Sequence, residues 1–199
     1  MDKHAGAVAE LVQQLGRLPG VGRKSAERLA FHLLRVPEAE AIALAESITR
    51  VRKDIRYCEA CFNLCEAELC SICADVGRDQ TRLCIVEQPR DLMSLEQSAA
   101  FQGVYHVLLG RIAPLDGIDP DQLTIEALVD RVRKGNFAEV IMATNPTVEG
   151  DGTSLYISNV LAEFPVEITR LARGITAGSV LEYANREIIA DALNGRQKL

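Results

Sequence analysis

The chain has 199 residues, of which 48% are hydrophobic, 25% charged and 5% aromatic, and its formal net charge is −6 at pH 7. This ordinary globular composition excludes a disordered chain, a collagen-like repeat and a small disulfide-rich scaffold. No apolar run reaches the roughly 18 to 20 residues that span a bilayer, and the first residues lack the layout of a secretory signal. We therefore expect a cytoplasmic protein that does not contact a membrane.

The charge is divided unevenly along the chain. Residues 1–56 hold 10 Lys and Arg against 7 Asp and Glu, a net +3, whereas residues 57–199 hold 12 against 21, a net −9. A basic N-terminal part on an acidic body is typical of a polyanion-binding module joined to a second module.

Two short helices joined by a glycine-containing turn are predicted at the N-terminus. Apolar residues recur at helical spacing over residues 7–16 and again over residues 24–34. In the turn between them, Gly20 and Gly22 permit backbone angles that other residues disfavour and let the main chain approach a ligand closely. The amides of the turn and the positive end of the second helix together predict an anion site.

Basic residues follow this turn at helical spacing. Lys24 and Arg28 are four residues apart and share one helix face, and Arg23 adds a third charge beside them. Because backbone amides and cations contact phosphates and not base edges, Gly20, Gly22, Arg23, Lys24 and Arg28 predict sequence-independent DNA binding. The alternative is a plain helical hairpin whose glycines only turn the chain.

Five of the six cysteines lie between residues 58 and 73. Cys58 with Cys61 and Cys70 with Cys73 form two C-x2-C pairs, which can direct four thiolates at one tetrahedral ion. We expect these four residues to hold one structural Zn2+ per chain, because a reducing cytosol disfavours disulfides. Metal binding would then supply the folding energy that so short a segment lacks. A four-thiolate iron–sulfur cluster and free thiols are the alternatives.

The remaining two cysteines are predicted to be non-ligands. Cys65 has no C-x2-C partner, and Cys84 stands in a short apolar run. A cysteine in such a run usually acts as a small buried hydrophobic residue.

Strands and helices alternate from about residue 82 onward. Short apolar strands are predicted over residues 83–86, 104–109, 140–143 and 166–171, with helices over residues 90–100, 123–132 and 153–164. Strand–helix repetition with continuous apolar strands indicates a parallel sheet covered on both faces. A last helix is predicted over about residues 185–199, with an apolar face that could pack on its own domain or on a neighbouring chain.

Acidic residues follow two of these strands. Glu87 ends the first strand with Asp91 one turn beyond, and Glu149 and Asp151 lie in the loop after the third strand. The carboxyl edge of an open α/β sheet is the usual binding crevice, and converging carboxylates there can hold Mg2+. The alternative is that Glu149 and Asp151 are solvated loop acids, with Asp151 or Thr153 capping the next helix.

Taken together, these motifs resemble the RecR family of bacterial recombination mediators over nearly the whole chain. The resemblance implies an α/β fold with a small N-terminal α domain, in which a parallel Toprim sheet is flanked by helices. It implies a helix-hairpin-helix DNA-binding domain, a four-cysteine zinc finger, a Toprim domain and a C-terminal arm over residues 1–55, 56–80, 81–176 and 177–199. The residues that carry the resemblance are 18–22, 24–26, the four paired cysteines, 86–87, 89–91, 114–117, 143–150 and 181–183.

Family resemblance also implies roles for the residues and partners. Glu87 matches the Toprim glutamate, and Glu149 with Asp151 match its paired acids, which would serve partner contacts or Mg2+ and not cleavage. RecR-like proteins are non-enzymatic; as homo-oligomeric dimers or tetrameric rings they bind single- and double-stranded DNA at the nucleoid. With RecO and RecF they help RecA displace single-strand-binding protein (SSB) at gaps. Thr176 replaces a proline of the family in residues 174–180.

Two other functions are consistent with the same residues. A metal-dependent Toprim nuclease or nucleotidyl-transfer enzyme would use Glu87, Glu149 and Asp151 to hold Mg2+. A passive DNA-binding adaptor would bind DNA without a role in loading a recombinase.

Overall fold

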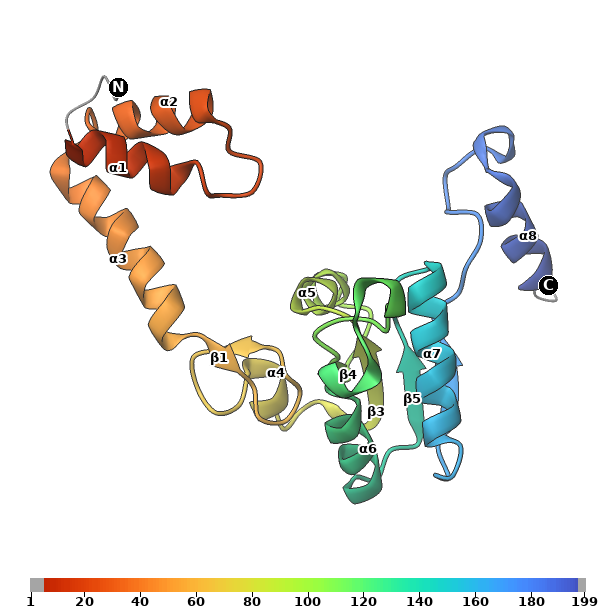
Figure 1. The fold of residues 1–199 in the computed structure, drawn as a ribbon. Coiled ribbons are helices and arrows are strands. Elements are labelled where there is room, and N and C mark those ends of the chain that lie inside the picture. The colour runs from red at the N-terminus through yellow and green to blue at the C-terminus, as the bar shows by residue number, and fades with distance from the viewer. Residues whose placement is uncertain (1–5, 197–199) are drawn as a thin grey trace. The chain divides into compact units, whose positions relative to one another are not determined.

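The structure, a computed structural model, describes residues 6–196 (Figure 1). The chain divides between Ile55 and Arg56 into two compact units. Within the described range no helix is both long enough and apolar enough to cross a membrane.

The N-terminal unit is helical. Its helices are α1 (Gly6–Leu15), α2 (Arg23–Leu33) and α3 (Glu38–Asp54). The two helices predicted from apolar spacing are confirmed as α1 and α2, which pack together through the buried Ala26 and Ala30 of α2. Helix α3 was not predicted from the sequence, and none of its residues is buried.

The second unit begins with the cysteine-rich segment and continues as the α/β domain. The segment contains β1 (Arg56–Tyr57), antiparallel to β2 (Leu64–Cys65), and the short helix α4 (Ser71–Ala74). A parallel sheet of order β4-β3-β5-β6 follows, which confirms the predicted fold class. Its strands are β3 (Asp79–Val86), β4 (Gly103–Val107), β5 (Glu139–Met142) and β6 (Glu167–Arg170).

Helices connect and follow these strands (Figure 1). They are α5 (Pro89–Gln97), α6 (Ile125–Lys134), α7 (Val148–Leu161) and α8 (Arg186–Asn194), with 3-10 turns at Pro114–Asp116, Pro120–Gln122 and Leu181–Tyr183. Helix α8 is shorter than the predicted C-terminal helix, of which residues 197–199 lie outside the described range.

Alternation along the central strand β3 divides the core between the two faces of the sheet. Leu83 and Ile85 pack with α6 and α7 on one face. Cys84 and Val86 point to the opposite face, where they pack with Leu92 of α5 and with the cysteine-rich segment. That segment therefore belongs to the core of the α/β unit. Its folding energy comes from this packing as well as from metal binding, which was expected to supply it alone.

Helix α7 begins earlier than predicted, at Val148 and not at Thr153. The side chain of Thr147 caps it by accepting a hydrogen bond from the Gly150 amide at 3.1 Å. Gly150 is buried so closely that a Cβ there would lie 2.1 Å from the Asn145 carbonyl oxygen. The prediction that Asp151 or Thr153 caps this helix is therefore wrong, because both residues lie inside its first two turns.

Candidate nucleic-acid interface and metal centre

The turn between α1 and α2 is open to a ligand. Gly20 has a φ of +78°, the left-handed region that glycine adopts without strain, and the Val21 amide donates to the Leu18 carbonyl at 3.0 Å. Gly22 is the N-cap of α2, and no side chain caps the first amides of that helix. No heavy atom lies within 4 Å of a Cβ built on either glycine, so a phosphate could approach this backbone.

The predicted DNA-binding cations differ in their surroundings. Lys24 and Arg28 are exposed, and no carboxylate in the described part of the chain forms an ion pair with either of them. Arg23, whose side chain is 83% exposed, donates through Nε to Oε1 of Glu27 at 3.3 Å. Two unpaired cations thus stand directly behind the open turn, an arrangement suited to a polyanion.

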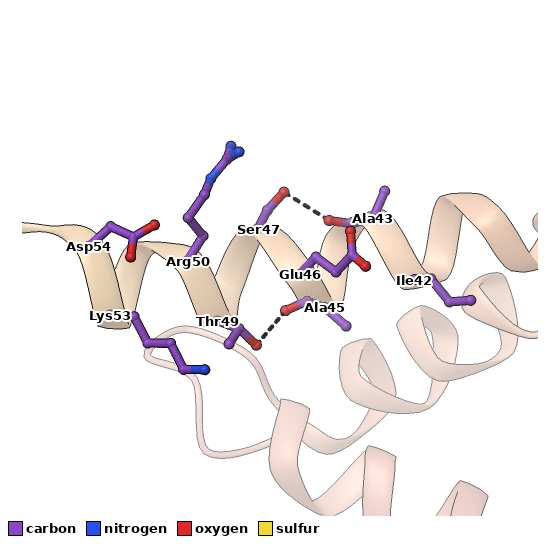
Figure 2. A pocket seen from close by; sticks show the side chains of 9 residues that line it. All are labelled: Ile42, Ala43, Ala45, Glu46, Ser47, Thr49, Arg50, Lys53 and Asp54. Carbon is purple, nitrogen blue, oxygen red and sulfur yellow. Dashed lines mark hydrogen bonds between the residues drawn. The ribbon is translucent and has the colours of Figure 1, made fainter. Parts of the chain in front are cut away.

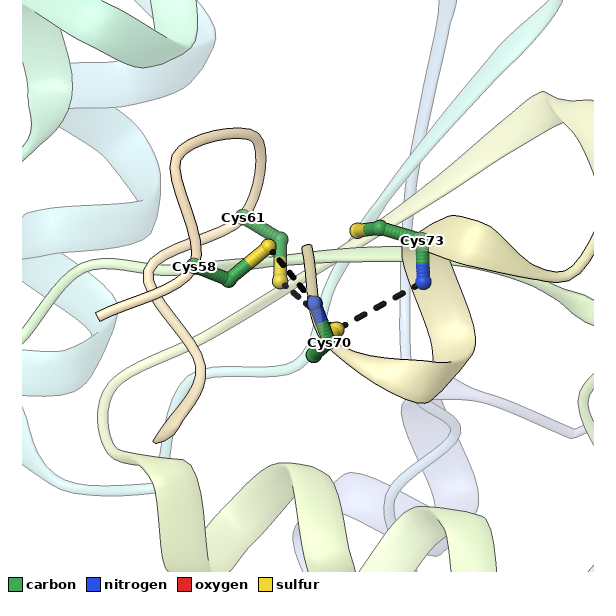
Figure 3. A group of neighbouring side chains, drawn as sticks. All are labelled: Cys58, Cys61, Cys70 and Cys73. Atoms are coloured by element: carbon green, nitrogen blue, oxygen red, sulfur yellow. Dashed lines mark hydrogen bonds between the residues drawn. The ribbon is translucent and has the colours of Figure 1, made fainter. Parts of the chain in front are cut away.

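The four paired cysteines converge on one point (Figure 3). Their sulfur atoms all lie within 4.8 Å of one another, and Sγ of Cys61 is 3.5 Å from Sγ of Cys70. Zinc–sulfur bonds of about 2.3 Å in a tetrahedron place the sulfurs roughly 3.8 Å apart. The donor set therefore fits Zn2+, for which four thiolates at this spacing form a tetrahedral structural site.

Hydrogen bonds act unequally on the four thiols of this cluster. The Cys70 amide donates to Sγ of Cys58 at 3.3 Å, and the Asn63 amide donates to Sγ of Cys61 at 3.5 Å. Hydrogen bonding with Cys61 lowers the pKa of the Cys70 thiol, whereas the same contact raises the pKa of the Cys61 thiol. Because adjacent thiolates repel one another, a bound cation is required for all four to be ionised.

The other two cysteines lie outside this cluster. Sγ of Cys65 donates to the Ala67 carbonyl at 3.0 Å. Cys84 is buried in β3, and burial raises the pKa of its thiol to about 12. Neither residue belongs to the group of cysteines that could share one ion.

Sequence reasoning missed the contacts that join the cysteine cluster to the edge strand β4. The Val107 amide donates to the Cys61 carbonyl at 2.8 Å, and Phe62 packs edge-on against the ring of His106 at 5.3 Å. Burial lowers the pKa of His106 to about 3, so this side chain is neutral at physiological pH. The cysteine segment therefore covers part of β4, an edge strand whose unpaired backbone groups could otherwise pair with another chain.

Helix α6 covers a second position on the same edge. The guanidinium of Arg131 donates to the Tyr105 carbonyl at 2.6 Å. No spacing motif links Arg131, Phe62 or His106 to the cysteines, so only three-dimensional proximity identifies them.

At the carboxyl end of β3, Glu87 is buried and fully engaged. Its Oε1 accepts from the Asn145 amide at 2.8 Å, and its Oε2 accepts from Nδ2 of Asn145 at 2.9 Å. Nη1 of Arg111 lies 3.9 Å from the same carboxylate. Asp91, one turn into α5, instead accepts from the Gln88 amide at 2.9 Å and so caps its own helix.

The two acids of the 149–151 segment differ from each other. Glu149 is exposed at the start of α7 and forms no ion pair with another described residue. Asp151 is paired with Arg170 and Arg173. Of the residues the structure describes, the cysteines are the one group of three or more donors that could hold an ion. The oxygens of Glu87 and Asp151 accept hydrogen bonds from Asn145, Arg170 and Arg173, and these donors compete with a metal ion for the same acids.

The chain matches three family models in succession. Residues 8–52 match the helix-hairpin-helix domain of RecR, residues 55–75 match the four-cysteine zinc finger domain of RecR, and residues 81–172 match a Toprim domain. A protein of Rhodopirellula baltica called "Recombination protein RecR" is 75% identical over the full length of both chains. Proteins with the same name from Pelotomaculum thermopropionicum and Treponema denticola are 46% and 47% identical, covering 100% and 96% of this chain and 100% and 98% of their own.

Replacing one ligand of the cysteine cluster tests its role. We expect Cys70→Ser to lose the zinc and to lower the melting temperature by roughly 10 °C or more, because structural zinc contributes directly to folding. Cys65→Ser should keep one zinc per chain and melt like the wild type. Metal content by mass spectrometry and thermal unfolding give the answer, and zinc retained by Cys70→Ser but lost from Cys65→Ser would contradict the assignment.

Proposed function

The chain belongs to the RecR family of recombination proteins, and on this premise we propose that it is a non-enzymatic mediator of DNA repair. In this role it binds gapped DNA without sequence preference, on single or double strands. Acting with RecO and RecF as a homo-oligomeric clamp, it helps load RecA on DNA coated by SSB.

The observation that carries the proposal is the open turn between α1 and α2. Gly20 and Gly22 leave the backbone uncovered, and the exposed Lys24 and Arg28 have no carboxylate partner among the described residues. Such a surface suits the phosphates of any DNA strand, because it offers amides and charge but no group aimed at base edges.

The carboxyl edge of the sheet supports partner binding in preference to phosphodiester chemistry. Glu87 is 2% exposed and is held by the backbone amide and the side-chain amide of Asn145, so it fixes the loop that leads from β5 to α7. Glu149, in the first turn of α7, is exposed to solvent and is free to meet a basic surface on another protein. Mg2+ bound by these acids is the alternative that a Toprim enzyme would need.

The proposed homo-oligomer has a candidate surface on α3. Ala41, Leu44, Ile48 and Val51 recur at alternate steps of three and four residues, the spacing of a coiled-coil seam. Leu44, Ile48 and Val51 are 47%, 59% and 59% exposed. Ser47 and Thr49 lie on opposite sides of α3, and their hydroxyls donate to the carbonyls of Ala43 and Ala45 of the same helix (Figure 2).

The charges of α3 favour an antiparallel pairing with a second copy. Its first turn carries Glu38 and Glu40, and its last turn carries Arg52 and Lys53. Two such helices side by side in opposite directions bring each acidic end against a basic end, whereas a parallel pair would align like charges.

Removing the two unpaired cations tests the DNA surface. The double variant Lys24→Ala/Arg28→Ala should weaken binding of unrelated DNA sequences alike and reduce the log–log salt slope by about one to two units. Fluorescence anisotropy at several salt concentrations measures both effects. Arg133→Ala/Lys134→Ala, which removes two cations from α6, is the matched control and should leave the slope unchanged. Equal slopes for both double variants would remove the turn from the DNA interface.

A charge placed in the α3 seam tests self-association. Ile48→Glu should lower the oligomer mass measured by light scattering, because burying an unpaired carboxylate between two helices is unfavourable. Ala43→Glu adds the same charge outside the seam, on the side of α3 that carries Ser47, and should assemble like the wild type. Circular dichroism verifies that both variants stay folded, and an unchanged mass for Ile48→Glu would refute the seam.

The mediator role is tested on gapped DNA coated with SSB. We expect RecA assembly to be faster with this protein and RecO together than with RecO alone, and the Lys24→Ala/Arg28→Ala variant to lose most of the stimulation. DNA binding without any stimulation would favour a passive adaptor. The same substrate with Mg2+ or Mn2+ serves as a cleavage assay, and cutting that Glu87→Ala abolishes would establish the Toprim enzyme in place of the mediator.

A further inference from the structure

Asp151, in the first turn of α7, is bound by two arginines that follow it in the chain. Its Oδ1 accepts from Nη2 of Arg170 at 2.7 Å, and its Oδ2 accepts from Nη1 of Arg173 at 2.9 Å. Nη2 of Arg173 also donates to Oδ1, so the guanidinium of Arg173 binds the carboxylate in a bidentate manner. Paired N–H donors of this kind form the strongest ion pairs that arginine makes.

This arrangement disfavours a divalent cation on Asp151. Both carboxylate oxygens accept charged hydrogen bonds, and two positive charges face a single negative one. Mg2+ needs oxygen ligands at about 2.0 to 2.1 Å in octahedral geometry, so it would compete with the guanidinium groups for this acid and be repelled by their charge. Hydrogen bonding from Arg173 also holds the pKa of Asp151 below its usual range, which keeps the carboxylate ionised and the pair intact at neutral pH.

Arg173 lies three residues beyond the end of β6, at the start of the C-terminal segment. The next residue, Gly174, has a φ of +139°, and a Cβ there would lie 3.2 Å from Cα and Cβ of Ala192 in α8. The guanidinium of Arg173 therefore pairs with a carboxylate on α7 at the point where the backbone approaches α8.

From these contacts we propose that Asp151 is a positioning residue, which anchors the C-terminal segment to α7 through Arg170 and Arg173. The anchored segment carries exposed apolar residues, with Leu181 at 62%, Tyr183 at 83% and Leu193 at 61% exposure. The anchor therefore fixes the position of these apolar side chains relative to the sheet.

Hydrogen exchange on the full-length protein tests the anchor. Asp151→Asn and Arg173→Gln should each make the amides of residues 174–195 exchange roughly threefold faster, as expected when a partly exposed ionic contact is lost. The double variant should exchange about as fast as Asp151→Asn alone, because loss of the Asp151 carboxylate already removes its contact with Arg173. Peptides from β3 and from the cysteine segment should be unchanged, which shows that the fold is intact.

Glu149→Gln is the matched control, since it removes the same charge from the same turn of α7 and should leave exchange unchanged. Wild-type protein in 10 mM Mg2+ should exchange and melt as it does in NaCl of equal ionic strength. Unaltered exchange of residues 174–195 in Asp151→Asn would overturn the anchor. Mg2+-specific protection lost in both Asp151→Asn and Glu149→Gln would show a metal site instead. No arm of the experiment uses DNA, so its result is independent of the mediator role.

Discussion

The convergence of four thiolates on one position is the constraint on which the second unit depends. Thiolates closer than 4.8 Å repel one another unless a cation neutralises them, so the fold of this segment and metal binding are one equilibrium. The effect extends beyond the cysteines, because the Cys61 carbonyl accepts from Val107 of the edge strand β4 and the segment fills part of the core. A zinc finger that looks like a separate module in the sequence thus packs against the Toprim sheet and shares its core.

The carboxyl edge of that sheet has the acids of a metal-dependent enzyme but surrounds them with the protein's own hydrogen-bond donors. An asparagine satisfies Glu87 and two arginines neutralise Asp151. A carboxylate fixed in this way orients the loop or segment that binds it. Such an edge can serve recognition of another protein without chemistry at phosphate, which agrees with membership in a family of recombination proteins.

The two units, which divide between Ile55 and Arg56, differ in the sign of their net charge: the N-terminal unit is basic and the second unit is acidic. The basic turn is carried by the helical unit and the acidic edge by the α/β unit, which reconciles DNA binding with a net charge of −6. Under the proposed function, phosphates would be attracted to the local field of Lys24 and Arg28, because no carboxylate among the described residues forms an ion pair with either cation. A chain that is acidic overall can therefore bind DNA through a small basic surface.

The sequence by itself determined the features that depend on local spacing: the α1–α2 hairpin, the two C-x2-C pairs and the parallel strands. Helical and strand periodicity are properties of neighbouring residues, so they are readable without a structure. Only the tertiary structure decided what each acid binds, since Arg170 and Arg173 meet Asp151 across 19 and 22 residues of chain. It also decided that the glycines near Asp151 belong to α7, because Thr147 supplies the cap and Gly150 fits where a larger side chain would collide with Asn145. Contacts of this kind depend on how distant segments pack, and no spacing rule along the chain encodes them.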